Sequence, residues 1–215
     1  MMKALLYKQF RLVCHPMTLI FLFFGVMLLI PIYPYTLVFF YVMLGLFFTF
    51  LNGREQRDIA YSALLPIRKR DTVRASVLFV LVIELASLLI AVPFALLSCR
   101  INPLGINAVG LEANAALFAA ALVLYALFNA IFLPAFYQTA YKVGLSFLKA
   151  IIPVSILMVL CEASVHFPGM SWLESHTAAG QLRLLPLLLI AAVIYGLGLW
   201  LTYRKAAENY EKVDL

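Results

Sequence analysis

Charged residues are scarce in this chain, and that scarcity excludes a soluble protein. Asp, Glu, Lys and Arg make up 12% of the 215 residues, whereas 65% are hydrophobic and the mean hydropathy is +1.01. Such a chain has more apolar surface than a soluble core could bury, so lipid must surround it. The sequence also lacks the alternating segments of a β-barrel, and long apolar runs favour helices, which satisfy their own backbone hydrogen bonds in hydrocarbon. We therefore predict an all-α, polytopic membrane protein.

The motifs of ATP binding and nucleic-acid binding are missing as well. None of the ten glycines belongs to a G-x-x-x-x-G-K-[ST] loop, so the chain has no phosphate cradle, and any ATP and Mg²⁺ must be bound by another chain. The net charge of +6 does not indicate a nucleic-acid partner, because the cations lie at the ends of apolar segments. We predict that the chain is not an enzyme and holds no cofactor.

Cysteine and metal-ligand patterns are equally sparse. The three cysteines, Cys14, Cys99 and Cys161, have no C-x-x-C spacing, which argues against a zinc or redox site. Cys99 and Cys161 are both expected on the outer side, but spacing alone does not establish a disulfide between them. Four His and Glu residues near the outer surface are not spaced as metal ligands, and we interpret them as scattered polar groups: Glu162, His166, Glu174 and His176.

The apolar runs predict a single transmembrane domain over 1–215 with six crossings. Residues 1–15 place basic and apolar side chains on different helical faces, as in a helix that lies in the membrane interface. The first crossing is short for a bilayer of about 30 Å and is closed by Pro16 and Pro31, so it borrows residues from the preceding segment or is re-entrant. The predicted transmembrane helices cover about 17–30, 36–51, 72–98, 114–137, 147–163 and 182–203.

Basic residues fix the expected orientation in the membrane. With six crossings, every lysine and arginine except Arg100 and Arg183 falls on the side that holds both ends of the chain. Segments rich in Lys and Arg stay in the cytoplasm, so we expect cytoplasmic N and C termini. The opposite orientation would place nearly every cation on the outer side.

One long polar segment, 53–74, interrupts the apolar sequence. It carries six basic and three acidic residues, and apolar pairs four residues apart such as Ile59 with Ala63, a pattern typical of a short amphipathic helix. We predict this helix over 54–66, where Pro66 ends it, on the cytoplasmic side. The alternative interpretation is a solvated loop whose cations only fix the topology.

The order of residues around this segment resembles a known group of transporters. The stretch LLPIRKRDTVR follows an acidic helix in the pattern of the small six-helix permeases of bacterial type-2 ABC exporters, which are encoded without an attached ATPase. A second block, LPAFYQTAYKVG at 133–144, is similar to the group's Pro, aromatic and Gly signature between the fourth and fifth helices. Permeases of phenol-soluble modulin exporters belong to this neighbourhood. The residues that match the first pattern are Asp58, Leu65, Pro66, Arg68 and Val73.

The resemblance implies a permease subunit in the bacterial plasma membrane. Such a subunit pairs with a second copy or a related permease, and the pair rests on two ATP-binding cassette ATPase subunits. The resemblance makes 54–66 the coupling helix that docks on the ATPase, and it implies export of amphipathic or hydrophobic cargo, with antimicrobial or cytolytic peptides as the first candidate. The residues that we expect to take part in ATPase coupling are Arg54, Arg57, Asp58, Tyr61, Leu65, Pro66 and Arg68.

Glu84 is the most informative polar residue within an apolar segment. It follows Arg74 by ten positions and therefore lies about 15 Å into the bilayer, where a carboxylate is normally paired, protonated or turned toward water. Tyr125 and Asn129 fall at a similar depth on the fourth crossing and are its candidate partners. Two interpretations stay open, a structural hydrogen bond and a role in substrate passage or proton movement.

Two other functions are compatible with the sequence. A membrane anchor or signalling subunit would use the polar segment to recruit a cytoplasmic partner without any transport. A proton-coupled secondary transporter would use Glu84 as its proton site, but the inverted repeats that would favour such a carrier are not recognisable. The exporter differs from both because it needs a separate ATPase.

Overall fold

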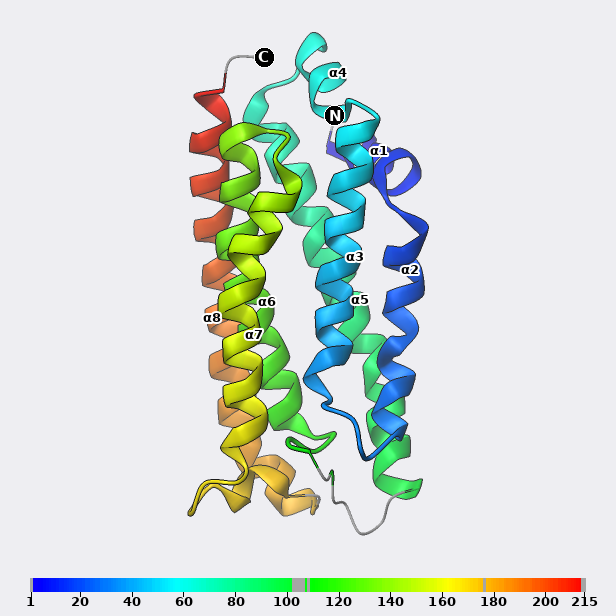
Figure 1. Ribbon diagram of the computed structural model, residues 1–215, viewed down its shortest axis with the longest axis vertical. Helices are drawn as coiled ribbons and strands as arrows, with labels where there is room; N and C mark the ends of the chain where they lie inside the picture. The colour runs from blue at the N-terminus through cyan, green and yellow to red at the C-terminus, as the bar shows by residue number, and fades with distance from the viewer. Residues whose placement is uncertain (1, 102–106, 108, 176, 214–215) are drawn as a thin grey trace.

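In the computed structural model, the long helices of the chain stand side by side as a bundle (Figure 1). The structure describes residues 2–101, 107, 109–175 and 177–213, and these contain no strand. Both ends of the chain and α4 lie at the same end of the bundle, at the top of Figure 1. The α-helices are α1 (Met2–Lys8), α2 (Pro16–Leu22), α3 (Thr36–Glu55), α4 (Asp58–Leu64), α5 (Lys69–Ile101), α6 (Ala115–Thr139), α7 (Val143–Ser164) and α8 (Ala178–Glu211).

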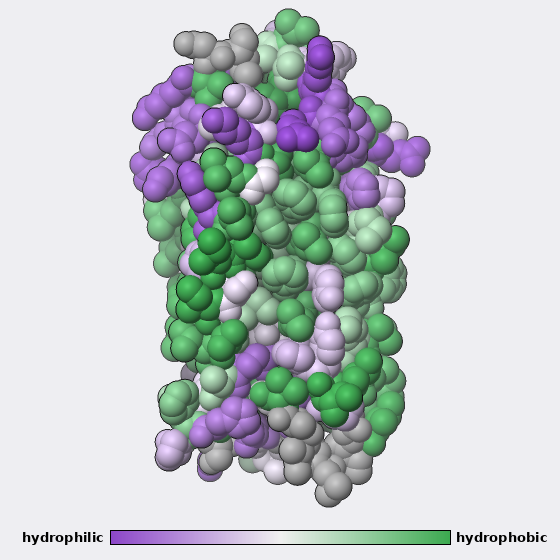
Figure 2. Space-filling model, viewed as in Figure 1, coloured by the Kyte–Doolittle hydropathy of each residue, from purple (hydrophilic) through white to green (hydrophobic). Residues whose placement is uncertain are grey.

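Five of these helices, α3, α5, α6, α7 and α8, are long and apolar enough to cross a membrane. The number rises to six if the bent N-terminal pair, Met2–Val13 with Pro16–Leu29, forms one crossing. Figure 2 shows a broad hydrophobic band around the middle of the molecule, with hydrophilic side chains gathered at the end where α4 lies. The prediction of an all-α polytopic membrane protein is confirmed.

The N-terminal segment bends sharply between its two halves. Met2–Val13, which ends in a π-helical turn, meets Pro16–Leu29 at 93°. The bend falls at His15, whose backbone is extended and whose Nδ1 accepts a hydrogen bond from the Met17 N–H at the start of α2. The segment expected at the interface is therefore set at about a right angle to the segment expected as the first crossing.

A close backbone approach holds α2 against α3. The Thr18 hydroxyl donates to the Gly45 carbonyl over 2.6 Å, and a Cβ atom placed on Gly45 would lie 2.9 Å from the Thr18 Cα. Any larger residue than glycine would push the two helices apart at this point. Glycine is thus required by the packing of α2, which makes α2 a part of the bundle.

Two helices extend well beyond their predicted ends. The third element, α3, continues to Glu55 instead of ending near residue 51, and α8 spans 34 residues, or about 50 Å at 1.5 Å per residue, which exceeds a hydrocarbon thickness of about 30 Å. The last turns of α8 remain helical because Ala206, Ala207 and Tyr210 are buried. As a result, α8 reaches the end of the bundle at which α4 lies.

The core is centred on α6, which packs along both α7 and α8. Half of the alanines of α6 are buried, including Ala116, Ala119 and Ala126. Ala126 faces Gly198 of α8, where an added Cβ would lie 3.4 Å from the Ala126 Cβ. Small residues on both helices allow this close approach, as is usual between helices in lipid.

Candidate coupling surface and intramembrane polar site

The predicted helix over 54–66 is interrupted in the structure. Arg54 and Glu55 belong to the end of α3, and α4 covers only Asp58–Leu64. Between them, Arg57 adopts the left-handed conformation (φ 53°, ψ 34°) and turns the chain sharply. The turn itself contains no glycine or proline, so the sequence does not indicate it. At the other end, Leu65 is extended (φ −86°, ψ 151°), as the residue before a proline is expected to be.

One face of α4 is bonded to the N-terminal segment. The Lys8 ammonium lies 2.7 Å from Asp58 Oδ1 and donates a second hydrogen bond, also 2.7 Å long, to the Ser62 hydroxyl. The Lys8 and Asp58 side chains are each only 13% exposed, and Ser62 is buried. Asp58, expected to take part in ATPase coupling, therefore faces the protein and fixes the position of α4.

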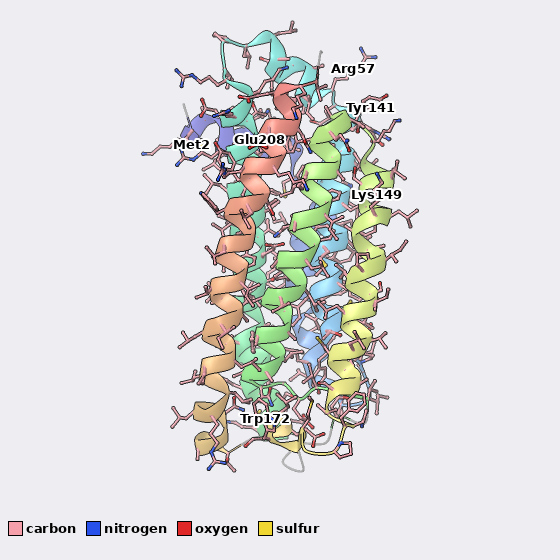
Figure 3. The ribbon with its side chains drawn as sticks, turned by 90° about the vertical axis from the view of Figure 1, so that its left-hand side faces the viewer. Met2, Arg57, Tyr141, Lys149, Trp172 and Glu208 are labelled. Carbon is pink, nitrogen blue, oxygen red and sulfur yellow. The ribbon has the colours of Figure 1, made fainter. Side chains whose placement is uncertain are left out.

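The opposite face of α4 is open to solvent. Tyr61 and Leu64 are 59% and 86% exposed, which is high for large apolar side chains at the polar end of the molecule. Arg54, Arg57 and Arg68 are also exposed around it. We call the surface formed by Arg54, Arg57, Tyr61, Leu64 and Arg68 the α4 surface; Figure 3 shows Arg57 projecting from this end.

The chain that leaves α4 is held by the end of α8. Arg70 donates from Nε and Nη2 to the two carboxylate oxygens of Glu211, over 2.6 and 3.0 Å. The neighbouring Lys69 donates to the Val213 carbonyl over 2.6 Å and lies over the Tyr210 ring. The segment between α4 and α5, which includes Leu65 and Pro66, is thus followed directly by a contact with the C-terminal helix.

A small polar cluster lies beneath α4 where several helices meet. Tyr137 of α6 donates to the Ser76 hydroxyl of α5 over 2.8 Å, and Gln9 of the N-terminal segment donates to the same oxygen over 3.2 Å. These side chains, with Asp58, line a cavity of about 20 Å³. The cluster connects the N-terminal segment to α5 and α6 directly below the α4 surface.

Glu84 forms a second polar site, inside the membrane-spanning part of the bundle. Its side chain is fully buried, and both of its carboxylate oxygens lie within hydrogen-bond distance of the Asn129 amide nitrogen, at 2.9 and 3.0 Å. Tyr195 of α8 donates to Glu84 Oε2 over 2.6 Å. The site therefore joins α5, α6 and α8 at one level.

The structure places the two candidate partners of Glu84 differently. Asn129 contacts the carboxylate, whereas the Tyr125 hydroxyl shares a 2.8 Å hydrogen bond with Ser87, one turn along α5. Tyr195 did not emerge from the sequence, although a signal was available. It precedes Arg204 by nine positions, so its distance along α8 from that basic residue nearly equals the distance of Glu84 along α5 from Arg74.

The polar residues at the end of the bundle opposite α4 contact the backbone. Glu162 Oε1 accepts from the Thr36 N–H and hydroxyl over 2.9 and 2.7 Å, and Oε2 accepts from the Leu111 N–H over 2.8 Å. His166 Nε2 lies 3.2 Å from the Val109 carbonyl, Glu174 is exposed, and His176 lies outside the described residues. Within the described ranges, these groups form no cluster of three or more metal-binding side chains.

The two cysteines expected on the outer side occupy different helices. The Cys99 thiol of α5 faces the Ala113 carbonyl at 3.9 Å, and Cys161 lies on α7 beside Glu162. No disulfide joins cysteines in the part of the chain that the structure describes.

Two apolar grooves open on the membrane-facing sides of the bundle. The larger, of about 590 Å³, lies between α3 and α7, and its lining includes the apolar side chains of Phe40 and Met158 and the polar side chains of Glu162 and His166. The smaller, of about 360 Å³, lies between α6, α7 and α8 and has an almost entirely apolar lining.

These features define a multi-pass helical membrane protein with an exposed amphipathic helix between two of its crossings. A sequence model for the ABC-2 family transporter proteins matches residues 4–211, which is nearly the whole chain, and the chain belongs to this family. It is therefore a membrane component of an ABC-2 transporter. No curated protein and no solved structure matches it.

Proposed function

We propose that this protein is the permease subunit of an ABC exporter, driven by a separate ATPase that docks on the α4 surface. The family assignment supports an ATP-binding cassette ATPase as the partner of this membrane component. The observation that points to α4 is its two-sided character. Lys8 fixes its inner face through Asp58 and Ser62, whereas Tyr61 and Leu64 present uncovered apolar area on its outer face.

The connections of α4 suit it to transmit movement. A two-residue turn joins it to α3, a short segment leads from it to α5, and the Lys8–Asp58 ion pair links it to the N-terminal segment. A rigid-body displacement of α4 would therefore act on three elements of the bundle together. Around the apolar centre, Arg54, Arg57 and Arg68 would attract and orient an acidic surface of the ATPase.

The orientation and assembly follow from the same reasoning. The end that holds α4 and both chain ends carries most of the cations, so it faces the cytoplasm of a bacterial plasma membrane, where ATP is available. Two permeases, identical or related, would sit side by side on two ATPase subunits. ATP and Mg²⁺ belong to those subunits.

The grooves support a cargo with apolar surface. The α3–α7 groove is large enough for several side chains and is lined mainly by apolar residues, with Thr36, Ser155, Glu162 and His166 as its polar side chains. An amphipathic molecule could bury its apolar face there and leave its polar face at the outer boundary. We therefore infer export of hydrophobic or amphipathic molecules, with antimicrobial or cytolytic peptides of the phenol-soluble modulin kind as the first class to test.

The test is whether an ABC ATPase binds this chain through α4 and changes its turnover in response. The tagged permease is purified from its host with the co-purifying ATPase, and ATP hydrolysis is measured in lipid vesicles with and without peptide cargo. Arg57→Glu should abolish co-purification and cargo-stimulated hydrolysis. Lys149→Glu changes another exposed cation toward the same end of the molecule, on α7, and is the matched control that should leave both intact (Figure 3).

Three results would overturn this assignment. A chain that recruits a cytoplasmic protein but supports no nucleotide turnover would be a membrane anchor. Transport that follows a proton gradient in vesicles without any ATPase would indicate a secondary transporter. Equal effects of Arg57→Glu and Lys149→Glu would show that docking does not depend on the α4 surface.

A further inference from the structure

The Glu84 site combines complete burial with the absence of a neighbouring cation among the described residues. Glu84 and Asn129 are fully buried and Tyr195 is 5% exposed, at the level where α5, α6 and α8 meet. The ion pairs among the described residues are Lys8–Asp58, Arg54–Glu55 and Arg70–Glu211, and none of them involves Glu84. The titratable groups beside Glu84 on the neighbouring helices are the phenols of Tyr125 on α6 and Tyr195 on α8.

The neighbouring side chains stabilise a negative charge on Glu84 only weakly. A carboxylate in a low-dielectric interior needs several donors or a positive charge to offset its lost hydration. Here the two oxygens share one amide nitrogen from Asn129, and Tyr195 adds a single hydroxyl at Oε2. A negative charge on Glu84 would therefore be incompletely compensated.

Asn129 provides a second, independent observation. Its amide oxygen is fully buried and accepts no hydrogen bond. The oxygen and nitrogen of an amide have nearly the same shape, and their assignment follows the hydrogen-bond network. If the amide is turned by half a rotation, its oxygen takes the position 2.9 to 3.0 Å from the Glu84 oxygens and becomes an acceptor for a proton on the carboxyl group, while its NH₂ group takes the buried position that the oxygen held.

We propose that Glu84, Asn129 and Tyr195 form a proton-binding site inside the membrane. The proton, taken from water, is held on Glu84 Oε1 and donated to the Asn129 amide oxygen, while Tyr195 donates to Oε2. The site is then neutral, and it joins α5, α6 and α8 without an unpaired charge. This site does not depend on the ATPase coupling proposed above.

The proton links the packing of these three helices to pH. A carboxylate at Glu84 gains hydration only if α8 moves away from α5 and α6 far enough to admit water, so ionisation favours the separated arrangement. The packed arrangement binds the proton and the separated arrangement releases it. Raising the pH therefore weakens the packed arrangement, and lowering it strengthens that arrangement.

Infrared spectroscopy of the full chain in lipid nanodiscs tests the proposal directly. At neutral pH the wild type should show a carbonyl-stretching band from one protonated carboxyl group, and Glu84→Gln should lose it. Glu162→Gln is the matched control. It changes a buried glutamate that accepts three hydrogen bonds, and it should keep the band. Tyr195→Phe retains Glu84 but removes the donor to Oε2, so the band should move to higher frequency.

Two outcomes would overturn the proposal. The first is a wild-type spectrum at neutral pH with no protonated-carboxyl band that responds to Glu84→Gln or Tyr195→Phe. The second is a Glu84-dependent carboxylate band that responds to Na⁺ or K⁺, which would make the site a cation site. If Glu84→Gln does not fold, the frequency change in Tyr195→Phe still identifies the group. The measurement needs neither cargo nor ATPase, so its failure leaves the exporter assignment untouched.

Discussion

The ammonium of Lys8 lies 2.7 Å from the carboxylate of Asp58, so the N-terminal segment is bonded to the helix that we propose as the ATPase contact. The two residues are 50 positions apart in sequence, and both side chains are largely buried in the structure. This contact between the N-terminal segment and α4 gives that segment a defined role in positioning the α4 surface.

Removing the Lys8 side chain should loosen α4 without unfolding the bundle. Lys8→Ala leaves the largely buried Asp58 and the buried Ser62 without their donor, and we expect α4 to lose about 1–3 kcal/mol of local stability. Hydrogen exchange of the amides in 58–64 measures this loss. Lys3→Ala, a change to an exposed residue of the same helix, should leave the exchange unchanged. Equal exchange in both variants would show that the ion pair does not hold α4.

The left-handed backbone of Arg57 makes opposite predictions for two substitutions. Glycine adopts φ near +53° without strain, so Arg57→Gly should keep the α3–α4 turn and gain up to about 1 kcal/mol of local stability. Proline is restricted to φ near −65°, so Arg57→Pro should disrupt α4. Both variants lose the positive charge, and exchange of the α4 amides separates the backbone effect from the charge. Unchanged exchange of the α4 amides in Arg57→Pro would contradict the left-handed backbone at Arg57.

The Glu162 contacts predict a stability effect at the end of the bundle opposite α4. Glu162→Gln replaces one acceptor oxygen by an NH₂ group and leaves the Thr36 or Leu111 N–H without a partner, which should cost about 1–3 kcal/mol. Thermal unfolding in detergent measures the change, and Glu174→Gln, at an exposed site, serves as the control. Gly110→Ala should be destabilising as well, because a methyl group there would overlap the Glu162 carboxylate.

Two glycine substitutions test whether α2 belongs to the bundle. Gly45→Ala places a methyl group against the Thr18 backbone and should cost about 1–3 kcal/mol by overpacking. Gly196→Ala on α8 meets nothing within 4 Å and should be neutral or slightly stabilising, since alanine is the better helix former. Thermal unfolding of the two variants distinguishes them. Equal melting temperatures would mean that α2 does not pack on α3 at Gly45.

The crossings were predictable from sequence because their signal is local. Apolar runs of sufficient length specify helices in lipid wherever the neighbouring helices lie, and the excess of Lys and Arg at one end predicts orientation independently of packing. The extended ends of α3 and α8 were missed for a related reason. Tyr210 and Ala206 hold the last turns of α8 by burial against other elements, and polar composition alone does not reveal that burial.

The polar sites were predictable only in part. Counting residues from the expected cytoplasmic end placed Asn129 at the depth of Glu84, but depth does not tell which side of a helix faces which neighbour. This explains why Tyr125 meets Ser87 and why Tyr195 was overlooked. The break at Arg57 had no sequence signal either, because arginine is not a residue associated with left-handed backbone and the turn is fixed by the contacts on both of its sides.

Residues near both chain ends bind the same short segment, 58–70. Lys8 binds Asp58, and Glu211 and Val213 bind Arg70 and Lys69. A fusion or affinity tag attached at either terminus would therefore be carried within a few residues of the α4 surface and would compete with whatever binds there. Reporter domains meant to leave the complex undisturbed belong at the far end of the bundle, for example in the turn around Gly169, whose added Cβ would meet nothing within 4 Å.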